Sequence, residues 1–417
     1  MNHVEIWLDD DSLGPKSLIG HLILSTGRSG DSIRFEYDDD WLGSKTPLRV
    51  FDLEPSLGAF PGPHHPMADN TLFGIFRDTS PDRWGRLLME RREIQRARSE
   101  GRPVKTLGEW DFLLGVADAG RMGALRLRDP ATRMFVADSE LPVPPVTRLR
   151  ELETIVAELE KAGAEDQPEY RAWLMQLTAP GTSLGGARPK ASFIDSDGSV
   201  WLAKFPANDD RRDIGQWEYL AATLAGQCAI AMPVSRSIEF SRRGHTFATK
   251  RFDRVGASRR HYASAMTLAG RSEGEPASYL DIVEVIETQG EKGRIAADLE
   301  QLYRRILFSI LIGNRDDHLR NHGFLRGQNG WMLSPAFDIN PNPDKAAHAL
   351  AIDEADPTPT TVTLTASRDF YRLSSKRAGE IEAEIRGVVA NWQAEAAKLG
   401  LARQEIAAME PVIVPGR

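Results

Sequence analysis

The sequence predicts an α+β fold with more than one domain, with strands in the first part of the chain and helices in the last. Short apolar runs separated by Gly- and Asp-rich turns occupy residues 1–60 and 191–252, a pattern typical of antiparallel strands. Apolar residues recur at helical spacing over 295–312 and 376–410. The 417 residues also exceed the about 250–300 at which a single core stops growing, so two or three domains are expected.

The composition excludes several classes of protein. A net charge of −8 argues against a general nucleic-acid coating protein, although it leaves room for a local basic patch. The single cysteine, Cys228, excludes an internal disulfide framework and lies in an apolar helical context. The first residues lack the basic start and apolar run of a signal peptide, and no apolar run approaches the about 20 residues of a membrane span. We therefore expect a cytoplasmic protein with no membrane partner.

The N-terminal part carries no catalytic pattern. A helix that begins at Asp78–Pro81 is basic, but glutamates interleave with its arginines, so a solvated or partner-facing surface is favoured over a nucleic-acid site. A Pro-rich segment at 141–146 reads as a linker. The other expected elements are a small antiparallel β unit at 1–60, a short helix at 110–116 and a strand at 121–127. The expected domains are residues 1–145, 146–254 and 255–417.

A glycine-rich loop opens the second domain after a helix at 151–161. Gly185, Gly186 and Ala187 allow the backbone to approach a phosphate closely, although most Gly-Gly turns are only turns. Lys204 lies inside an otherwise apolar strand, where its charge requires an anionic partner. A nucleotide phosphate or a carboxylate of the next helix would supply that partner.

Glu218 on that next helix is the candidate carboxylate. Lys204 and Glu218 together are similar to the strand lysine and helix glutamate of protein kinases. The alternative is an unrelated surface lysine and surface glutamate. The remaining elements expected after 190 are strands at 191–194, 200–205, 236–240 and 245–252, a helix at 214–226, helices at 278–289, 295–312 and 376–410, and a short strand at 361–365.

The strongest signal for chemistry begins where the apolar helix at 295–312 ends, at Gly313. Asp316 and Asn321 stand five positions apart, the interval of the protein-kinase loop H-R-D-x-x-x-x-N. In that loop the Asp orients or deprotonates the attacking hydroxyl and the Asn holds a metal ion. The alternative for this piece alone is a solvated loop.

A predicted hairpin then brings a second carboxylate to the loop. Strands at 323–325 and 331–333 are joined by a Gly-containing turn and lead to Asp338. Magnesium keeps much of its water, so one Asp, one Asn and phosphate oxygens suffice to bind it as a nucleotide complex. The order of helix, Asp, Asn, hairpin and Asp therefore predicts phosphoryl transfer with ATP and Mg²⁺.

These segments together resemble the HipA family of serine/threonine kinases, the toxins of bacterial toxin–antitoxin systems, over nearly the whole chain. The carrying motifs are Ser183–Lys190 (SLGGARPK), Trp201–Pro206 (WLAKFP), Lys250–Arg254 (KRFDR), Asn314–Asn321 (NRDDHLRN) and Leu333–Asp338 (LSPAFD), with residues 73–85 matching the family's N-terminal unit. The resemblance implies a protein-kinase-like fold with a small β-rich N-terminal lobe and an all-helical C-terminal lobe, preceded by a small β-rich subdomain.

The resemblance also assigns roles to individual residues. It implies that Asp316 is catalytic, with His318 and Arg320 at neighbouring loop positions, and that Asn321 and Asp338 bind magnesium. Asp317 stands where Gly is usual, which leaves open which carboxylate faces the substrate, and the interval to Asn321 favours Asp316. The implied ATP-binding residues are Ser183, Gly185, Gly186, Ala187, Lys190, Lys204, Glu218, Lys250 and Phe252, and Ser183 is also the expected site of inhibitory autophosphorylation.

The partners follow from the resemblance as well. It implies a small dimeric helix-turn-helix antitoxin like HipB, operator DNA bound only through that antitoxin, and a protein substrate in translation such as an aminoacyl-tRNA synthetase. The segment at 261–268 lacks the Gln-Glu-Asp pattern of the best-known members, so the substrate does not carry over directly. Two alternatives stay open: a small-molecule phosphotransferase, and a non-enzymatic protein that only binds an antitoxin and its operator.

Overall fold

The structure is a computed structural model of the chain. It describes residues 1–27, 30–43, 50–67, 70–137, 143–178, 186–354, 357–358 and 360–416. These residues form two compact units, one of Met1–Asn208 with Lys250–Ala263 and one of Asp209–Thr249 with Ser264–Arg417. The division expected from the sequence, at 145 and 254, stays a prediction. No helix among the described residues is long and apolar enough to cross a membrane.

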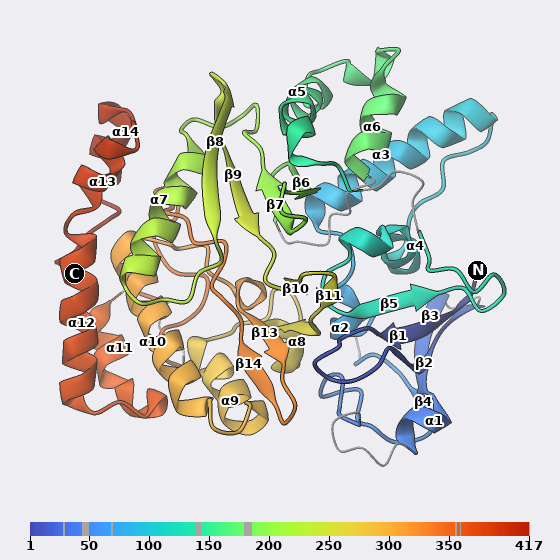
Figure 1. Cartoon of the computed structure of the whole chain (residues 1–417), viewed down its shortest axis with the longest axis horizontal. Coiled ribbons are helices and arrows are strands. Elements are labelled where there is room, and N and C mark those ends of the chain that lie inside the picture. Colours follow the sequence, from blue (N-terminus) through green and yellow to red (C-terminus); the bar gives the residue numbers. More distant parts are fainter. Residues whose placement is uncertain are drawn as a thin grey trace. The chain divides into compact units, whose positions relative to one another are not determined.

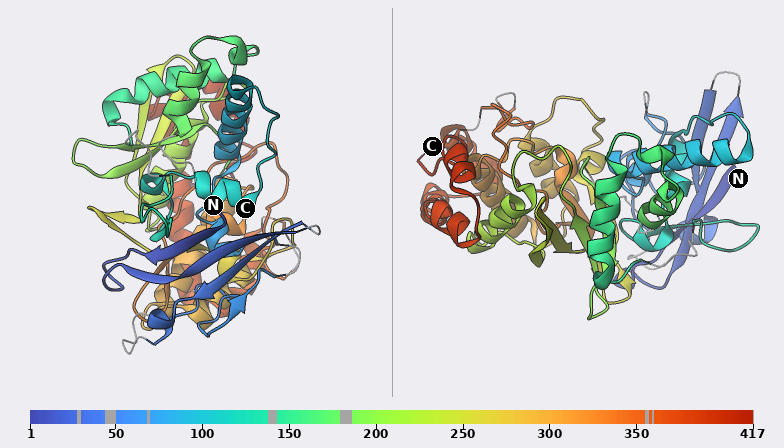
Figure 2. Two further views of the ribbon diagram at one scale, coloured as in Figure 1. Left: turned by 90° about the vertical axis from the view of Figure 1, so that its right-hand side faces the viewer. Right: turned by 90° about the horizontal axis from the view of Figure 1, so that it is seen from above.

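The first unit begins with a five-stranded antiparallel sheet, drawn in blue and teal in Figure 1, which confirms the small β unit expected there. Its strand order is β4-β3-β2-β1-β5. Val4, Ile6 and Leu8 alternate with less buried residues along β1, so one face of the strand lies in the core. Figure 2 shows the blue strands side by side in this one sheet. The strands are β1 (His3–Leu8), β2 (Ser17–Gly27), β3 (Gly30–Tyr37), β4 (Pro63–His64) and β5 (Leu125–Arg128).

The basic helix of this unit begins later than the sequence predicts. The prediction placed its start at Asp78–Pro81, but the Thr79 and Ser80 hydroxyls donate to the Phe76 carbonyl and end the preceding helix α2 (Gly74–Arg77). Asp82 is the cap of α3 (Arg83–Glu100), because its carboxylate accepts a hydrogen bond from Gly85 N at 2.7 Å. The other helices of the unit are α1 (Asp39–Leu42), α4 (Glu109–Gly115), α5 (Leu149–Leu159) and α6 (Tyr170–Thr178).

A second antiparallel pair of strands also belongs to the first unit. Strands β6 (Lys190–Ile194) and β7 (Val200–Lys204) place Lys190 opposite Lys204. The Pro-rich segment predicted as a linker contacts this pair, because Ile194 N donates to the Pro144 carbonyl at 2.9 Å. The short pair β10 (Arg254–Val255) and β11 (Ser258–Arg259) follows later in the chain. Strand β12 (Tyr262–Ser264) lies where the chain passes to the second unit.

Asp253 binds the returning segment Lys250–Ala263 to the rest of the first unit. Its buried carboxylate accepts hydrogen bonds from Arg251 at 2.8 and 2.6 Å, from Arg254 at 2.6 Å and from Gly123 N at 2.8 Å. Burial opposes the charged form, but the two arginines hold the pKa of Asp253 well below its ordinary value. The motif KRFDR is therefore largely a structural ion cluster.

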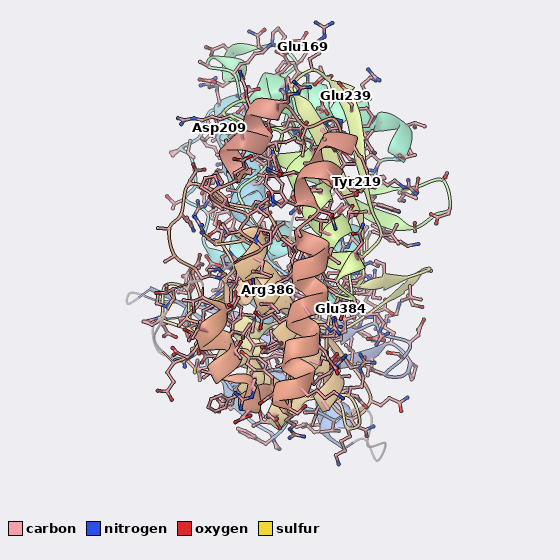
Figure 3. All side chains as sticks on the ribbon, turned by 90° about the vertical axis from the view of Figure 1, so that its left-hand side faces the viewer. Glu169, Asp209, Tyr219, Glu239, Glu384 and Arg386 are labelled. Atoms are coloured by element: carbon pink, nitrogen blue, oxygen red, sulfur yellow. The ribbon has the colours of Figure 1, made fainter. Side chains whose placement is uncertain are left out.

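The second unit is built around helix α10 (Ile295–Ile312), which confirms the buried helix predicted from its apolar stripe. Helices α7, α9, α11 and α12 all contact it. Figure 3 labels Glu384 on α12, and its carboxylate lies 2.9 Å from Arg304 Nη1 of α10. The helices of the unit are α7 (Ile214–Gln227), α8 (Ala265–Leu268), α9 (Tyr279–Gln289), α10, α11 (Thr361–Ala366), α12 (Ser375–Val389), α13 (Trp392–Lys398) and α14 (Arg403–Met409).

One expectation for this unit is wrong. The β-branched run at 361–365 is helix α11, because Thr360 caps it by accepting from Thr363 N and Leu364 is buried where α11 contacts α10. Tertiary packing here overrides strand propensity. The unit also carries the antiparallel pairs β8 (Ser235–Ser241) with β9 (Gly244–Lys250), expected at 236–240 and 245–252, and β13 (Gly323–Arg326) with β14 (Trp331–Leu333). The second pair confirms the predicted hairpin.

Asp253→Asn is expected to lower the free energy of unfolding by about 3–5 kcal/mol at neutral pH, because two arginines remain buried without their anion. Since the folded pKa lies below the unfolded one, this stabilisation is present above about pH 4 and is lost as the pH falls. The difference between mutant and wild type in urea unfolding should therefore shrink in acid. Asp31→Asn, on an exposed position of β3, is the control and should change little.

Candidate functional site

The C-terminal end of α10 sets the direction of the candidate catalytic loop. Gly313 ends the helix with a left-handed φ of 74°. A Cβ at this position would lie 2.5 Å from Val412 Cγ1 and 2.8 Å from the Val412 carbonyl, so only glycine fits. Asn314 N then donates to the Ser309 carbonyl at 2.9 Å. The loop of residues 314–321 therefore leaves a rigid helix end in one fixed direction.

The two adjacent carboxylates of this loop have opposite environments. The Asp316 side chain is 56% exposed and forms an ion pair with Lys345 Nζ. The Asp317 side chain is 6% exposed and lies between Tyr279 and His322. Only Asp316 is accessible to a substrate. Asp316, which the spacing to Asn321 favours, is the exposed carboxylate of the two, and its role toward an acceptor stays a prediction.

Asp317 instead fastens the loop to helix α9. Tyr279 OH donates to Asp317 Oδ2 at 2.8 Å, and His322 Nε2 lies 3.0 Å from Asp317 Oδ1. Burial opposes ionisation of Asp317, but His322 and the Tyr279 hydroxyl hold its pKa below the ordinary value. Burial and the neighbouring Asp317 charge raise the pKa of Tyr279 well above its own ordinary value. The phenol therefore stays protonated and remains the hydrogen-bond donor.

The other predicted loop residues lie in or beside the short 3-10 turn η4 (Leu319–Asn321). His318 precedes this turn and is exposed. Arg320 Nη1 lies 3.0 Å from Glu273 Oε2. Asn321 Nδ2 donates to the Asp316 carbonyl at 3.2 Å, so the amide oxygen is the atom of Asn321 that suits a metal ion.

Two buried ionisable residues of α10, Asp298 and Arg305, hold the start of the segment that leads to Asp338. Asp298 accepts a hydrogen bond from Leu333 N at 3.1 Å, and Arg305 donates to the Ser334 carbonyl at 2.5 Å. Burial lowers the pKa of Arg305 to about 10, so it keeps its charge at neutral pH. The end of strand β14 is thus held at a fixed position along α10.

The turn around Asp338 contacts the start of the candidate catalytic loop. Asn340 N donates to Asn314 Oδ1 at 3.3 Å, and Asn342 N donates to the Gly313 carbonyl at 2.9 Å. Asp338 itself is half-buried and has a left-handed φ of 58°. Such a conformation costs energy in a non-glycine residue and is found most often where the backbone must aim a side chain. The structure therefore ties the turn with Asp338 to the loop with Asp316 and Asn321.

The described residues contain no group of three or more His, Cys, Asp or Glu that could hold a metal ion by itself. One carboxylate and one amide oxygen are nevertheless an appropriate donor set for magnesium, which is bound through few protein ligands when phosphates and water complete its shell. Asn321 and Asp338 fit that description. Their roles as ligands stay a prediction.

In the first unit, the end of the glycine-rich loop is held by a buried ion pair. Lys190 Nζ lies 2.5 Å from Asp82 Oδ2 and 2.9 Å from the Gly186 carbonyl, and its side chain is 1% exposed. Gly186 has a left-handed φ of 94°, and Ala187 is exposed. Ser183 and Gly185 lie outside the described residues. Lys190 thus binds the carboxylate of Asp82, whereas the sequence predicts that it binds ATP.

The remaining predicted nucleotide residues are distributed over both units. Lys204 is buried in β7 of the first unit and Glu218 is buried in α7 of the second, so their pairing stays a prediction. Lys250 Nζ lies 3.7 Å from Asp197 Oδ2. The Phe252 ring lies 6.0 Å from that of Tyr262.

Three residues of this site carry no signal that the sequence analysis used. Lys345 falls in a stretch predicted only as loop, and Tyr279 and His322 lie far apart from each other in the sequence. His322 directly follows Asn321, so its place beside the loop could have been noted, but its partner could not. Only the folded chain brings Tyr279, Asp317 and His322 together.

Comparison with known proteins gives one family and a few relatives. The sequence model of the HipA-like C-terminal domain matches residues 182–398. A Sinorhizobium fredii (strain NBRC 101917 / NGR234) protein named "Putative kinase Y4dM" is 24% identical over 185 residues, which cover 38% of this chain and 44% of that protein. The match therefore spans less than half of this relative's length.

Two solved structures are similar. One is HipA of the Shewanella oneidensis MR-1 toxin–antitoxin system, in a complex with HipB and operator DNA. It has a TM-score of 0.63 and 17% identity, with 98% of this chain and 94% of that chain covered. The other is the proinflammatory kinase CtkA of Helicobacter pylori, with a TM-score of 0.43, 15% identity, and coverage of 55% and 88%. The first likeness shows the fold and confirms the α+β, kinase-like architecture expected from the sequence.

Asp317→Asn is expected to lower the free energy of unfolding by about 1–3 kcal/mol, because His322 and Tyr279 lose a buried, charged hydrogen-bond partner. Asp316→Asn is the matched control one residue away and should change it by no more than about 0.5 kcal/mol, since its carboxylate is exposed. Urea unfolding of both variants measures the difference. Equal destabilisation of the two would contradict the assigned environments.

Proposed function

Because the chain belongs to the HipA-like C-terminal domain family, we propose that it is an ATP- and magnesium-dependent serine/threonine protein kinase. The observation that carries this proposal is the exposed carboxylate of Asp316 in the loop after a buried helix. The backbone carbonyl of Asp316 also accepts a hydrogen bond from the Asn321 side chain. The turn with Asp338 is hydrogen-bonded to the same loop. This is the set of groups that phosphoryl transfer requires.

In the proposed reaction Asp316 orients the acceptor hydroxyl and takes its proton. The hydroxyl oxygen forms a bond to the γ-phosphorus of ATP, and the bond from that phosphorus to the β,γ-bridging oxygen breaks, so that ADP leaves with the electron pair. Asn321 and Asp338 would hold magnesium, which neutralises phosphate charge when bound. Exposure of Asp316 supports a protein acceptor, because a side chain on another protein can reach it.

The residues proposed to bind the ATP phosphates are those that the family resemblance indicates. We assign the backbone of Gly186 and Ala187 and the ammonium of Lys204 to the phosphates, with Glu218 as the partner of Lys204. Lys190 would position the loop through Asp82, or bind phosphate after leaving it. Lys250 and Phe252 are assigned to the nucleotide, and Ser183 and Gly185 to the loop, on the family resemblance.

The proposed biological role is that of a toxin inhibited by its antitoxin. The similar HipA of Shewanella oneidensis was solved with HipB and operator DNA. We propose a dimeric helix-turn-helix antitoxin as partner, with operator DNA bound through it, since this chain carries a net charge of −8. The proposed substrate is a component of translation, such as an aminoacyl-tRNA synthetase, and autophosphorylation of Ser183 is the proposed second means of inhibition.

Asp316→Asn should lower the rate of phosphate transfer by about 10²–10⁴-fold while ATP binding is largely kept, because the proton acceptor is lost but the shape is not. Phosphoproteomics after induction of wild type and of this variant tests both the activity and its substrate class. New phosphoserine or phosphothreonine only with the wild type supports the proposal. Phosphorylation of a metabolite instead of protein would favour the small-molecule alternative, and an unchanged rate would remove Asp316 from the mechanism.

Asp338→Asn should weaken magnesium-dependent ATP binding, because the amide lacks the charge that attracts the ion, and asparagine accepts the left-handed backbone of this position. Asp338→Ala should show the same loss with added backbone strain. The control is Asp344→Asn, an exposed carboxylate of the same segment. Calorimetric titration with ATP, with and without Mg²⁺, gives the answer. Equal affinities for wild type and Asp338→Asn would mean that Asp338 is not a ligand.

A further inference from the structure

The candidate catalytic carboxylate, that of Asp316, is paired with a cation that has no role in the proposed mechanism. Lys345 Nζ forms an ion pair with Asp316 Oδ1, and the two side chains are 46% and 56% exposed. Lys345 follows the turn of Asp338 by seven residues in the sequence. The cation therefore comes from the segment beyond the proposed metal ligand and not from the catalytic loop itself.

The backbone around Lys345 is fixed on both sides. Before it, Asn342 N donates to the Gly313 carbonyl at 2.9 Å. At Lys345 itself, the carbonyl accepts a hydrogen bond from Arg315 Nη1. The placement of this side chain against Asp316 is thus a property of the fold and not of an unattached loop.

The same segment is anchored again beyond Lys345, on helix α9. Tyr279 N donates to the Ala351 carbonyl, and Ala351 N donates to the Ala277 carbonyl, each at 3.0 Å. His348, between these points and Lys345, is buried, and its ring packs edge-on against Tyr279. Tyr279 also holds Asp317. One residue of α9 therefore contacts both the catalytic loop and the segment that presents Lys345.

The ion pair contributes little to stability as such. Both partners are about half exposed, and exposed pairs are worth little because water screens them and long side chains lose freedom. Arg320, a cation of the loop itself, instead lies 3.0 Å from Glu273. The ion pair of Lys345 with Asp316 is therefore weak, although the backbone that presents Lys345 is well anchored. Such a lysine can exchange its partner during a reaction.

We propose that Lys345 is a further catalytic residue, which binds the phosphoryl group during transfer; this rests on the proposed kinase function. The acceptor oxygen held by Asp316 must come within about 3–3.5 Å of the γ-phosphorus, so an ammonium that reaches Asp316 also reaches the phosphoryl oxygens. Lys345 leaves Asp316 for the more highly charged phosphate when ATP binds. Asp316 is then released to take the hydroxyl proton.

Lys345 keeps its proton throughout the step. Its ammonium donates hydrogen bonds to the equatorial oxygens of the transferring phosphoryl group, over which charge is spread in the transition state. The bonds that form and break are those of the proposed reaction. Before ATP binds, the same ammonium occupies the carboxylate. Lys345 thus makes Asp316 available as a proton acceptor only when a phosphoryl group is present.

The test compares Lys345→Ala, Lys345→Gln and Lys345→Arg with wild type. Transfer of phosphate from ATP–Mg to protein is measured as the ATP concentration is raised, and thermal unfolding verifies that each variant folds. Lys345→Ala and Lys345→Gln should lower kcat by about 10²–10³-fold, because the contact with the phosphoryl oxygens strengthens in the transition state. Lys345→Arg keeps the charge and should recover most of the rate. Lys376→Ala removes an exposed lysine of α12 and is the control.

The outcomes separate this inference from the function on which it rests. If wild type transfers no phosphate to protein, the proposed function fails. If wild type is active and the folded Lys345→Ala or Lys345→Gln variant has the wild-type kcat, the role of Lys345 is overturned. A higher KM with unchanged kcat also overturns it, because Lys345 would then only bind ATP. Failure of Lys345→Arg to recover activity while the uncharged variants stay inactive would show that charge is not what this position supplies.

Discussion

Burial of helix α10 is the constraint on which the candidate site depends. Its left-handed end at Gly313 directs the catalytic loop, and its charged residues Asp298 and Arg305 bind the backbone of residues 333 and 334. A buried charge is costly unless it is hydrogen-bonded, so these two residues hold the end of strand β14 at one position along the helix. Asp316 and Asp338 are thus both presented from the same rigid element. A shift of α10 would displace both halves of the site together.

Burial also decides what each carboxylate of the adjacent pair does. Asp316 and Asp317 share a charge and a loop, yet one side chain is 56% exposed and the other 6%. The buried carboxylate is held by a tyrosine and a histidine and fixes the loop. The exposed one is accessible to another molecule. In the first unit the buried carboxylates of Asp253 and Asp82 likewise bind buried cations, those of Arg251 and Lys190.

Much of this protein is determined by its sequence alone. The 3.6-residue apolar period predicts α10, the alternation and glycine turn predict hairpin β13–β14, and the interval from Asp316 to Asn321 predicts a phosphoryl-transfer loop. These are local signals, in which a few consecutive residues contain the cause of their own structure. The α+β class and the family follow from the order of such segments. Helix starts are less certain, because a cap such as Asp82 competes with other capping residues nearby.

Tertiary structure decided what depends on contacts between distant residues. The run at 361–365 has strand propensity, but it forms a helix that contacts α10 and buries Leu364. Lys190 has the sequence context of a phosphate ligand and binds Asp82, which lies more than one hundred positions earlier. The pairing of Lys345 with Asp316 and of Tyr279 with Asp317 has no local pattern, because a charge in a loop specifies no partner until the chain has folded. The sequence determined which chemical groups this protein has, and only the fold decided which of them meet.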